Sequence, residues 1–250
     1  MKFRLSNAAI IAALFATSSA QATPVRFEGA SEASGMRDLP ANARLADALL
    51  QARPRPDAYL LGTSFERPQA MEEQVRLRAG LQYGAEQLAD SSDAETSALA
   101  QTLMDWLAAH PATGRKPIAG TARLIQVQPA NNPVLAAGDT LRLPLQPRTI
   151  TVMGAVGQAC VLRHAPQRDA RDYLRDCNPS RLADRNDIYV IQPDGRVQQL
   201  GIALWNRADP QAIAAGGTLF VPLRAQLIKR IDPLFNRDFA AFIATQPVSP

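Results

Sequence analysis

A ten-residue segment of this chain occurs twice, with an offset of 78 residues. The first copy, residues 136–145, reads AAGDTLRLPL, and the second, residues 214–223, reads AAGGTLFVPL, so seven of the ten positions are identical. Each copy has a glycine turn followed by a short apolar strand, which a proline ends because proline has no N–H to donate to a sheet. The repeat raises the question of whether more of the chain is duplicated.

The segments before the first copy predict three short elements. Apolar and polar side chains alternate over residues 24–30, which end in Gly-Ala, and this pattern is typical of a strand. Residues 43–50 predict a short helix, and residues 57–62 predict a second strand.

The second half has the same order of elements. Residues 149–155 predict a strand that ends in Gly-Ala, residues 170–174 a short helix, and residues 187–191 another strand. An Asp-x-Tyr sequence aligns Tyr59 of the first half with Tyr189 of the second. We therefore interpret the first half as a diverged copy of the second.

The alignment of the two halves exposes an insert. The offset is 130 residues at Tyr59 but 81 at Arg115, which aligns with Arg196, so the first half has 49 more residues between these points. In the second half, residues 193–196 predict a tight Asp-Gly hairpin turn. The insert thus opens a hairpin at its turn, where added length is tolerated best.

The insert, residues 66–112, predicts a pair of helices. Pro68 stands at the start of the first helix, and Ser92 with Glu95 predicts a capping box for the second. The second helix carries apolar residues at helical spacing, namely Leu99, Leu103, Trp106 and Leu107. Such a stripe has to be buried against the rest of the protein or against a partner.

The C-terminal residues predict an amphipathic helix of about 14 residues, too short to span a bilayer. Asp232 is expected to cap it, with Pro233 at its first position. Its apolar face consists of Phe235, Phe239, Phe242 and Ile243. We expect this face to dock on the second domain; the alternative is a helix that is released to contact a membrane surface or a partner.

The first 22 residues are typical of an export signal. Lys2 and Arg4 precede an apolar run at residues 8–15, and a small-x-small site predicts cleavage after Ala22. Since no cysteine lies at this site and no later apolar run reaches about 20 residues, we expect neither a lipid anchor nor a membrane span. The remaining net charge of +2, from 25 basic and 23 acidic residues, argues against nucleic acid as a partner.

Cys160 and Cys177 are the only cysteines. In an oxidising compartment such a pair favours a disulfide, which would stabilise the fold by about 3 kcal/mol. A redox or metal site is the alternative, but the spacing is not CxxC and the nearest further ligand is His164.

Motifs of catalysis are absent from the sequence. His110 and His164 stand in different halves, and there is no HExxH, GxSxG, P-loop or GxGxxG. We expect no catalytic residues, no metal and no cofactor, and hence a protein that is not an enzyme.

Arg115 is the one candidate ligand-binding residue. It lies in TGRKP, residues 113–117, where the insert rejoins the first domain. Its planar group of five donors can bind backbone carbonyls or an anion. Arg115 therefore either braces the insert against the sheet or lines a pocket for an anionic or sugar ligand, and both interpretations stay open.

The two copies resemble the β-grasp (ubiquitin-like, soluble-ligand-binding) modules of polysaccharide export proteins such as Wza. The order of export signal, helical insert, TGRKP, second module and terminal helix resembles the GfcC-like capsule biosynthesis proteins. The resemblance implies an α+β fold with two tandem β-grasp domains, residues 23–147 and 148–225, followed by the terminal helix and tail at 226–250. It also implies that Arg115 lines a central pocket.

The function expected from this resemblance is periplasmic and non-catalytic. The protein would assist assembly and export of a capsule or exopolysaccharide by binding or scaffolding, with the polysaccharide or the outer-membrane export machinery as its partner. One alternative is a periplasmic carbohydrate-processing enzyme, which needs two carboxylates around a cleft. The other is a purely structural adaptor for an outer-membrane export pore.

Overall fold

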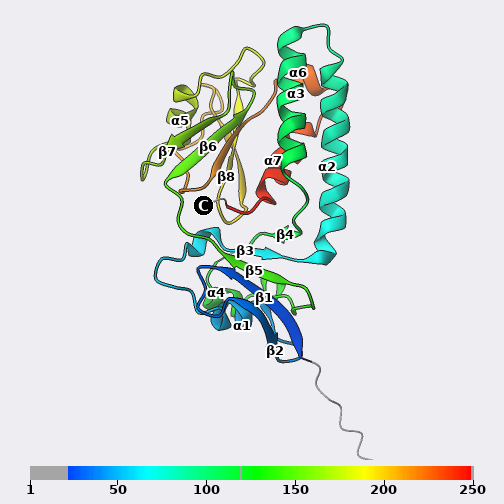
Figure 1. Ribbon diagram of the computed structural model, residues 1–250. Helices are drawn as coiled ribbons and strands as arrows, with labels where there is room; N and C mark the ends of the chain where they lie inside the picture. The colour runs from blue at the N-terminus through cyan, green and yellow to red at the C-terminus, as the bar shows by residue number, and fades with distance from the viewer. Residues whose placement is uncertain (1–21, 119, 249–250) are drawn as a thin grey trace, which may run out of the picture.

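The computed structural model describes residues 22–118 and 120–248. Residues 1–21 of the predicted export signal therefore lie outside the described residues. The chain forms two mixed five-stranded sheets, one above the other in Figure 1, with a long helical hairpin beside the upper one. None of the helices within the described residues is long and apolar enough to cross a membrane.

The first sheet has the strand order β2-β1-β5-β3-β4. Its strands are β1 (Thr23–Gly29), β2 (Gly35–Leu39), β3 (Ser64–Glu66), β4 (Arg115–Lys116) and β5 (Thr140–Leu143). The pair β1 and β5 is parallel, and the other neighbours are antiparallel. Four short helical segments accompany the sheet: α1 (Leu45–Gln51), η1 (Leu60–Gly62), α4 (Ala122–Gln126) and η2 (Pro129–Asn131).

The second sheet repeats this topology with the order β7-β6-β10-β8-β9. Its elements are β6 (Thr149–Gly154), β7 (Cys160–Arg163), α5 (Ala170–Asp176), β8 (Asp187–Ile191), β9 (Val197–Gly201) and β10 (Thr218–Val221). Here β6 and β10 form the parallel pair. The duplication is therefore confirmed, and the repeated segment supplies the central strand of each sheet, β5 and β10.

The strand predicted at residues 57–62 is wrong. Residues 60–62 form the helical turn η1, and the strand begins at Ser64. Tyr59 instead donates its O–H to the carbonyl of Ala215 in the second domain, at 2.9 Å. The shared Asp-x-Tyr sequence therefore aligned two positions that do not correspond. The actual strand, β3, has only three residues, which is too short to show the alternation of side chains that would have located it.

Strand pairing corrects the size of the insert. Glu66 pairs with Thr140 in the first sheet, and Ile191 pairs with Thr218 in the second. Glu66 and Ile191 are therefore equivalent, and the offset here is 125 residues rather than 130. In the same way, Arg115 pairs with Glu66 and Val197 pairs with Ile191, so Arg115 and Val197 are equivalent, with an offset of 82 residues. The difference between 125 and 82 gives an insert of 43 residues rather than 49.

The insert forms the predicted helical pair, α2 (Pro68–Ala89) and α3 (Ala94–Ala109). Pro68 is the first residue of α2, as expected. The cap of α3 is Asp93 rather than Ser92: its Oδ2 accepts the backbone N–H of Thr96 at 3.1 Å. A carboxylate at this position also suits the positive end of the helix dipole.

The two insert helices pack on the second sheet, although they branch from the first. Their buried side chains, including Leu81, Leu103 and Leu107, belong to one core with Val152 of β6 and Phe220 of β10. The first sheet has a separate core. Figure 1 shows the hairpin standing alongside the second sheet, with the C-terminal helix between them.

The C-terminal segment contains α6 (Ala225–Ile228) and α7 (Phe235–Ala244). Asp232 does not cap α7 directly, because its Oδ1 accepts the N–H of Leu234, one residue before the helix begins. The predicted apolar face is docked: Phe235, Phe239 and Phe242 are 0% exposed and Ile243 is 5% exposed. A membrane-facing or partner-facing role would need these side chains to leave the core and stays a prediction.

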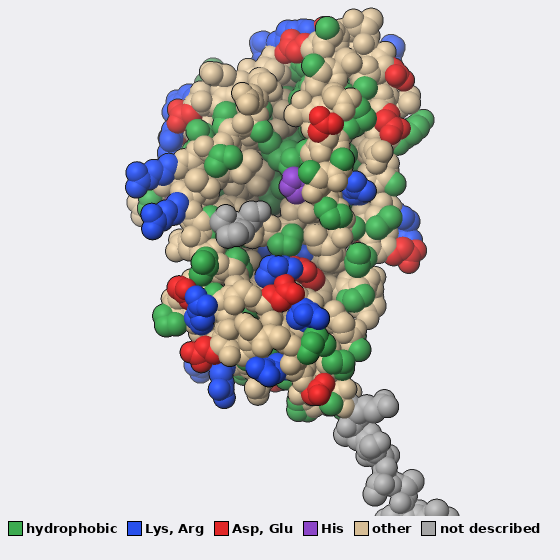
Figure 2. Space-filling model, viewed as in Figure 1, with side chains coloured by type: hydrophobic (Ala, Val, Ile, Leu, Met, Phe, Trp, Pro, Cys, Tyr) green, Lys and Arg blue, Asp and Glu red, His purple; other side chains and the backbone are tan. Residues whose placement is uncertain are grey.

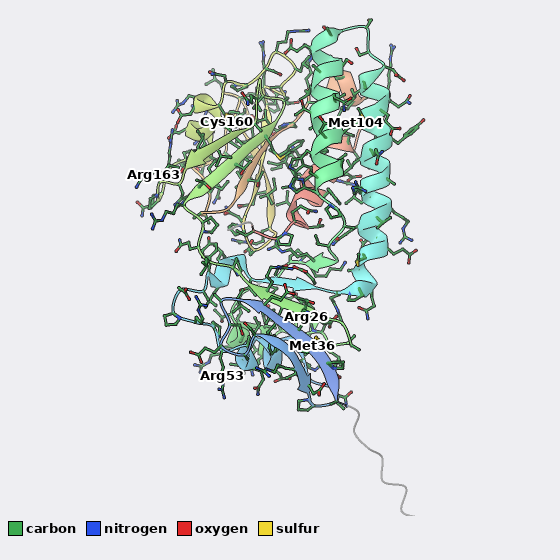
Figure 3. The ribbon with its side chains drawn as sticks, in the orientation of Figure 1. Arg26, Met36, Arg53, Met104, Cys160 and Arg163 are labelled. Carbon is green, nitrogen blue, oxygen red and sulfur yellow. A yellow bond between two sulfur atoms is a disulfide. The ribbon has the colours of Figure 1, made fainter. Side chains whose placement is uncertain are left out.

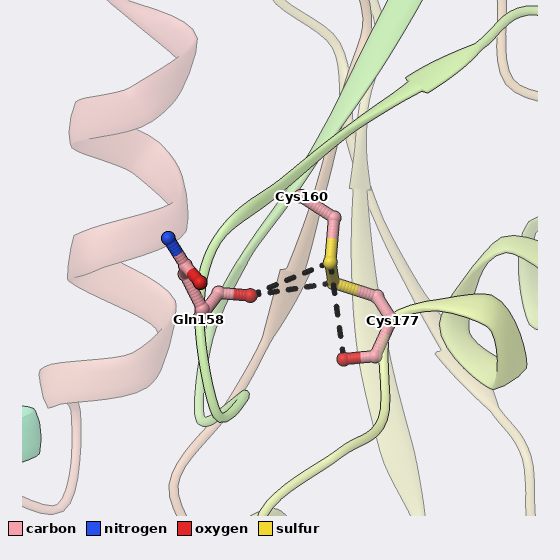
Figure 4. The surroundings of a disulfide bond; sticks show 3 residues. All are labelled: Gln158, Cys160 and Cys177. Carbon is pink, nitrogen blue, oxygen red and sulfur yellow. Dashed lines mark hydrogen bonds between the residues drawn. A yellow bond between two sulfur atoms is a disulfide. The ribbon is translucent and has the colours of Figure 1, made fainter.

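Cys160 and Cys177 form a disulfide that joins the start of β7 to the end of α5. The carbonyl oxygen of Gln158 lies 3.4 Å from Sγ of Cys160 and 3.6 Å from Sγ of Cys177 (Figure 4). The two cysteines, 17 residues apart in the sequence, therefore form the predicted disulfide.

The double variant C160S/C177S is expected to lose about 3 kcal/mol of unfolding free energy, because the unfolded chain regains the entropy that the cross-link removes. Urea unfolding measures this loss, and the natural protein treated with reductant serves as a control that should show the same loss. Non-reducing mass spectrometry of protein taken from its own host gives a second check. Two free thiols there would contradict the disulfide.

Candidate functional site

A cavity of about 840 Å³ lies between the two sheets, and every part of the chain contributes to its wall. The first domain, the insert, the second domain and the C-terminal segment supply, among others, Arg55, Arg142, Trp106, His110, Arg115, Gln192, Pro193 and Gln246. Figure 2 shows basic and acidic side chains gathered at the waist between the two domains. Of the residues predicted for a site, Arg115 and Ile243 line this cavity.

Gln74, a buried side chain of α2, holds the backbone that carries Arg115. Its Nε2 donates to the carbonyl of Arg115 at 2.8 Å. Its Oε1 accepts the N–H groups of Thr113 at 3.0 Å and Gly114 at 2.7 Å. The first insert helix therefore fixes strand β4 at the point where the insert rejoins the sheet.

The guanidinium of Arg115 joins the two domains. Nη1 donates to the carbonyls of Gln246 at 2.6 Å and Ala244 at 3.2 Å, and Nη2 donates to the carbonyl of Pro193. Ala244 ends α7, and a positive charge is favourable at the carbonyl end of a helix. Arg115 thus braces through carbonyls, as one interpretation held, but these belong to the second domain and the C-terminal segment.

Burial lowers the pKa of Arg115 to about 10, although Asp194 and Glu66 act in the opposite direction. The side chain therefore stays charged near neutral pH. It is 2% exposed, its Nε has no hydrogen-bond partner within the described residues, and no carboxylate there forms an ion pair with it. A buried guanidinium without a directly paired carboxylate favours an anion in the adjoining cavity.

The other arginines of the cavity wall have carboxylate partners. Arg142 pairs with Glu28 at 2.9 Å and with Glu66 at 3.2 Å. Arg55 pairs with Asp57, and the hydrogen bond from Arg55 holds the pKa of the Asp57 carboxyl below its usual value. Arg115 is therefore the cavity arginine whose charge is left for a ligand to neutralise.

Sequence reasoning did not assign Trp106 and His110 to the site. Their rings stack with centroids 4.0 Å apart, and Nδ1 of His110 lies 2.7 Å from the carbonyl oxygen of Trp106. Trp106 also contacts Phe239 and Phe242 of α7. The available signal was their spacing of one helical turn at the end of α3, which places both rings on one side of the helix.

The described residues contain no group of three or more His, Cys, Asp and Glu side chains placed to hold a metal ion. The disulfide does not line the cavity. The aromatic residues of α7 lie beneath it in the core, where they hold the helix end that accepts the hydrogen bonds of Arg115.

Comparison with known proteins identifies the second half of the chain. The chain is 31% identical over 154 residues to the uncharacterized protein YjbG of Escherichia coli (strain K12), and the match covers 62% of each chain, less than two thirds of that relative. Residues 158–246 match the family described as Capsule biosynthesis GfcC C-terminal. That segment runs from the approach to β7 through α7 and includes the three carbonyls that bind Arg115. This segment of the chain is therefore similar to the capsule biosynthesis GfcC C-terminal family.

Proposed function

We propose that this protein is a non-catalytic, periplasmic accessory factor for the assembly and export of a capsule or exopolysaccharide, and that it binds a segment of that polysaccharide in the interdomain cavity. The observation that carries the proposal is Arg115: a charged, buried guanidinium with an unpaired Nε, beside a cavity that both domains enclose. The match of residues 158–246 to a capsule biosynthesis family supports the biological setting.

The periplasmic location is supported by the disulfide and by the export signal predicted from the sequence. We further assign both domains to the β-grasp fold. In each domain a parallel central pair of strands is flanked by antiparallel neighbours, and a short helix, α1 or α5, follows the first two strands.

The wall of the cavity is more suited to binding than to hydrolysis. Its described lining residues include the stacked rings of Trp106 and His110 and three arginines, but no Asp or Glu. An aromatic face can pack on a sugar ring, and arginine can bind its carboxylate or hydroxyl oxygens. Hydrolysis of a glycosidic bond would require a pair of carboxylates.

Deletion of the gene in the native host is expected to reduce surface polysaccharide and to increase the amount retained in the periplasm. Staining of intact cells measures the first quantity, and sugar analysis of the periplasmic fraction measures the second. Unchanged amounts of both would contradict a role in export.

Arg115→Lys is expected to weaken binding of the host polysaccharide at least ten-fold, because an ammonium cannot reproduce the planar guanidinium. NMR chemical-shift titration of the full chain measures binding, and the spectrum without ligand reports whether the fold is kept. Arg163→Lys is the matched control, since Arg163 is exposed at the outer edge of the second domain (Figure 3). Equal weakening in both variants would contradict the site. No shifts in the natural protein, together with co-purification of an outer-membrane protein, would favour the structural adaptor.

A further inference from the structure

A second cavity, of about 400 Å³, lies in the second domain away from the first sheet. It is built where the loop before β8 meets the segment between β10 and α6. The N–H of Asp184 donates to Pro222 at 2.8 Å, and the N–H of Arg224 donates to Leu182 at 2.9 Å. In Figure 1, α6 lies beside the upper part of the insert helices, at the end opposite the first sheet. The cavity shares no lining residue with the interdomain cavity.

Three arginines line this second cavity, and two of them have no ion-pair partner within the described residues. Arg181 pairs with Asp93 and Glu95 of the insert. The side chains of Arg185 and Arg224 form no ion pair or hydrogen bond with another residue in the described part of the chain, and Nε of Arg224 is buried without an acceptor. Two like charges on one small cavity repel each other, and an anion between them removes that repulsion.

The carboxylate of Asp184 also lines the cavity, but within the described residues it forms no ion pair with these arginines. Oδ1 of Asp184 accepts the backbone N–H groups of Asn186 at 2.7 Å and Asp187 at 3.2 Å. It therefore shapes the loop on which Arg185 stands. The cavity is left with an excess of positive charge and a fixed backbone.

An exposed aromatic ring is hydrogen-bonded to one residue of the cavity wall, Asn186. Trp205, in the loop after β9, is 78% exposed, and its Nε1–H donates to Oδ1 of Asn186 at 3.3 Å. Asn206 anchors the same loop, since its Nδ2 donates to the carbonyl of Asn186 at 3.1 Å. Because Asn186 also lines the cavity, this hydrogen bond ties the indole to one residue of the cavity wall, while most of the Trp205 surface stays open to solvent.

We infer that this cavity and Trp205 form a second saccharide site, one that takes an anionic sugar. A sugar ring packs on the open indole, and its carboxylate or phosphate enters the cavity to accept hydrogen bonds from Arg185 and Arg224. A flat apolar face with a polar edge suits the first contact, and a planar guanidinium suits the second. The volume of the cavity lies in the range of small-ligand pockets.

The recessed position of Arg224 favours a compact anion over a membrane surface. Its Nε is inaccessible to solvent, so an acceptor for this N–H has to enter the cavity, although the residue as a whole is partly exposed. The indole N–H is already bonded to Asn186, which ties the edge of the ring to the protein. Exposed Leu204 beside Trp205 is the feature that a membrane surface would use instead.

The test is a titration of the full chain with trigalacturonate and with glucose 6-phosphate, followed by calorimetry and tryptophan fluorescence. Maltotriose is the neutral comparison. We expect saturable binding of at least one anionic sugar and at least ten-fold weaker binding of maltotriose. Arg185→Met and Trp205→Ala, both at exposed positions, should each weaken binding at least ten-fold, and Trp205→Ala should remove the part of the fluorescence change that this indole contributes.

Two controls separate this site from its surroundings and from the interdomain cavity. Arg207→Met removes an exposed charge from the same loop outside the cavity and should leave binding unchanged. The interdomain cavity has its own variant: Arg115→Lys is expected to weaken binding of the host polysaccharide there, whereas Arg185→Met and Trp205→Ala change only the second site, so this inference and the proposed function can fail independently. Absence of saturable binding for both anionic sugars, or equal binding of maltotriose, would overturn the inference. Sedimentation with phosphatidylglycerol vesicles but no sugar binding would also overturn it, in favour of a membrane surface.

Discussion

Phe239→Ala is expected to lower the free energy of unfolding by about 4 kcal/mol, which corresponds to a fall in melting temperature of roughly 10 °C. Phe239 of α7 is 0% exposed. Its ring stacks on Phe220 of β10 with centroids 5.1 Å apart and lies 5.4 Å from Trp106 of the insert and 5.8 Å from Phe235. Truncation leaves a cavity where the second sheet, the insert and the C-terminal helix meet, so all three lose packing.

Leu234→Ala is the matched control, because Leu234 directly precedes α7 and is 46% exposed. Its expected loss is below about 0.5 kcal/mol, since the change removes little buried surface. Urea unfolding followed by circular dichroism measures both variants. A loss below 1 kcal/mol for Phe239→Ala would mean that α7 contributes little to stability in solution. That result would favour the released helix over the docked one.

Gly29→Ala is also expected to cost about 4 kcal/mol, through left-handed backbone strain and steric overlap together. Gly29 has a φ of 79°, and a Cβ on it would lie 2.2 Å from the carbonyl oxygen of Leu143. That oxygen accepts the N–H of Ala30 at 2.7 Å, at the end of the parallel pair β1 and β5. The substitution therefore forces the central strands apart. Gly154, at the equivalent position of the second domain, meets Val221 in the same way.

Gly35→Ala separates the two contributions. Gly35 has a φ of 100°, but a Cβ there would meet nothing within 4 Å. Its expected loss is about 1 kcal/mol, from backbone strain alone. Thermal unfolding of the two variants gives the difference. Equal losses would show that the approach of Gly29 to Leu143 is relaxed at little cost.

Much of the fold follows from local patterns in the sequence. The glycine-strand-proline segments predict β5 and β10, and the apolar stripes predict α2, α3 and α7. The two cysteines predict the disulfide. These succeeded because turn geometry and side-chain periodicity act over a few residues. The strand predicted at residues 57–62 failed because β3 has only three residues, and a matching Asp-x-Tyr pair drew the alignment to the wrong place.

The candidate site was foreseen only in part. The sequence singled out Arg115 because it stands where the insert rejoins the sheet, and the structure places it on the cavity wall. Trp106 and His110 were seen only as the end of a helix. Arg224 lines the second cavity and Trp205 is hydrogen-bonded to Asn186 of its wall, but the two residues are 19 apart in the chain and nothing in the pattern between them indicates a shared site.

The sequence by itself determined the two repeated units, the helical insert in the first, and the apolar face of the last helix. Only the tertiary structure decided that the insert packs on the second sheet, and that Arg115 binds carbonyls 78 and 131 residues further along the chain. The reason is physical. An apolar stripe requires burial but does not specify its partner, and a guanidinium requires acceptors but does not specify their source. Both choices depend on which surfaces fit when the whole chain is folded.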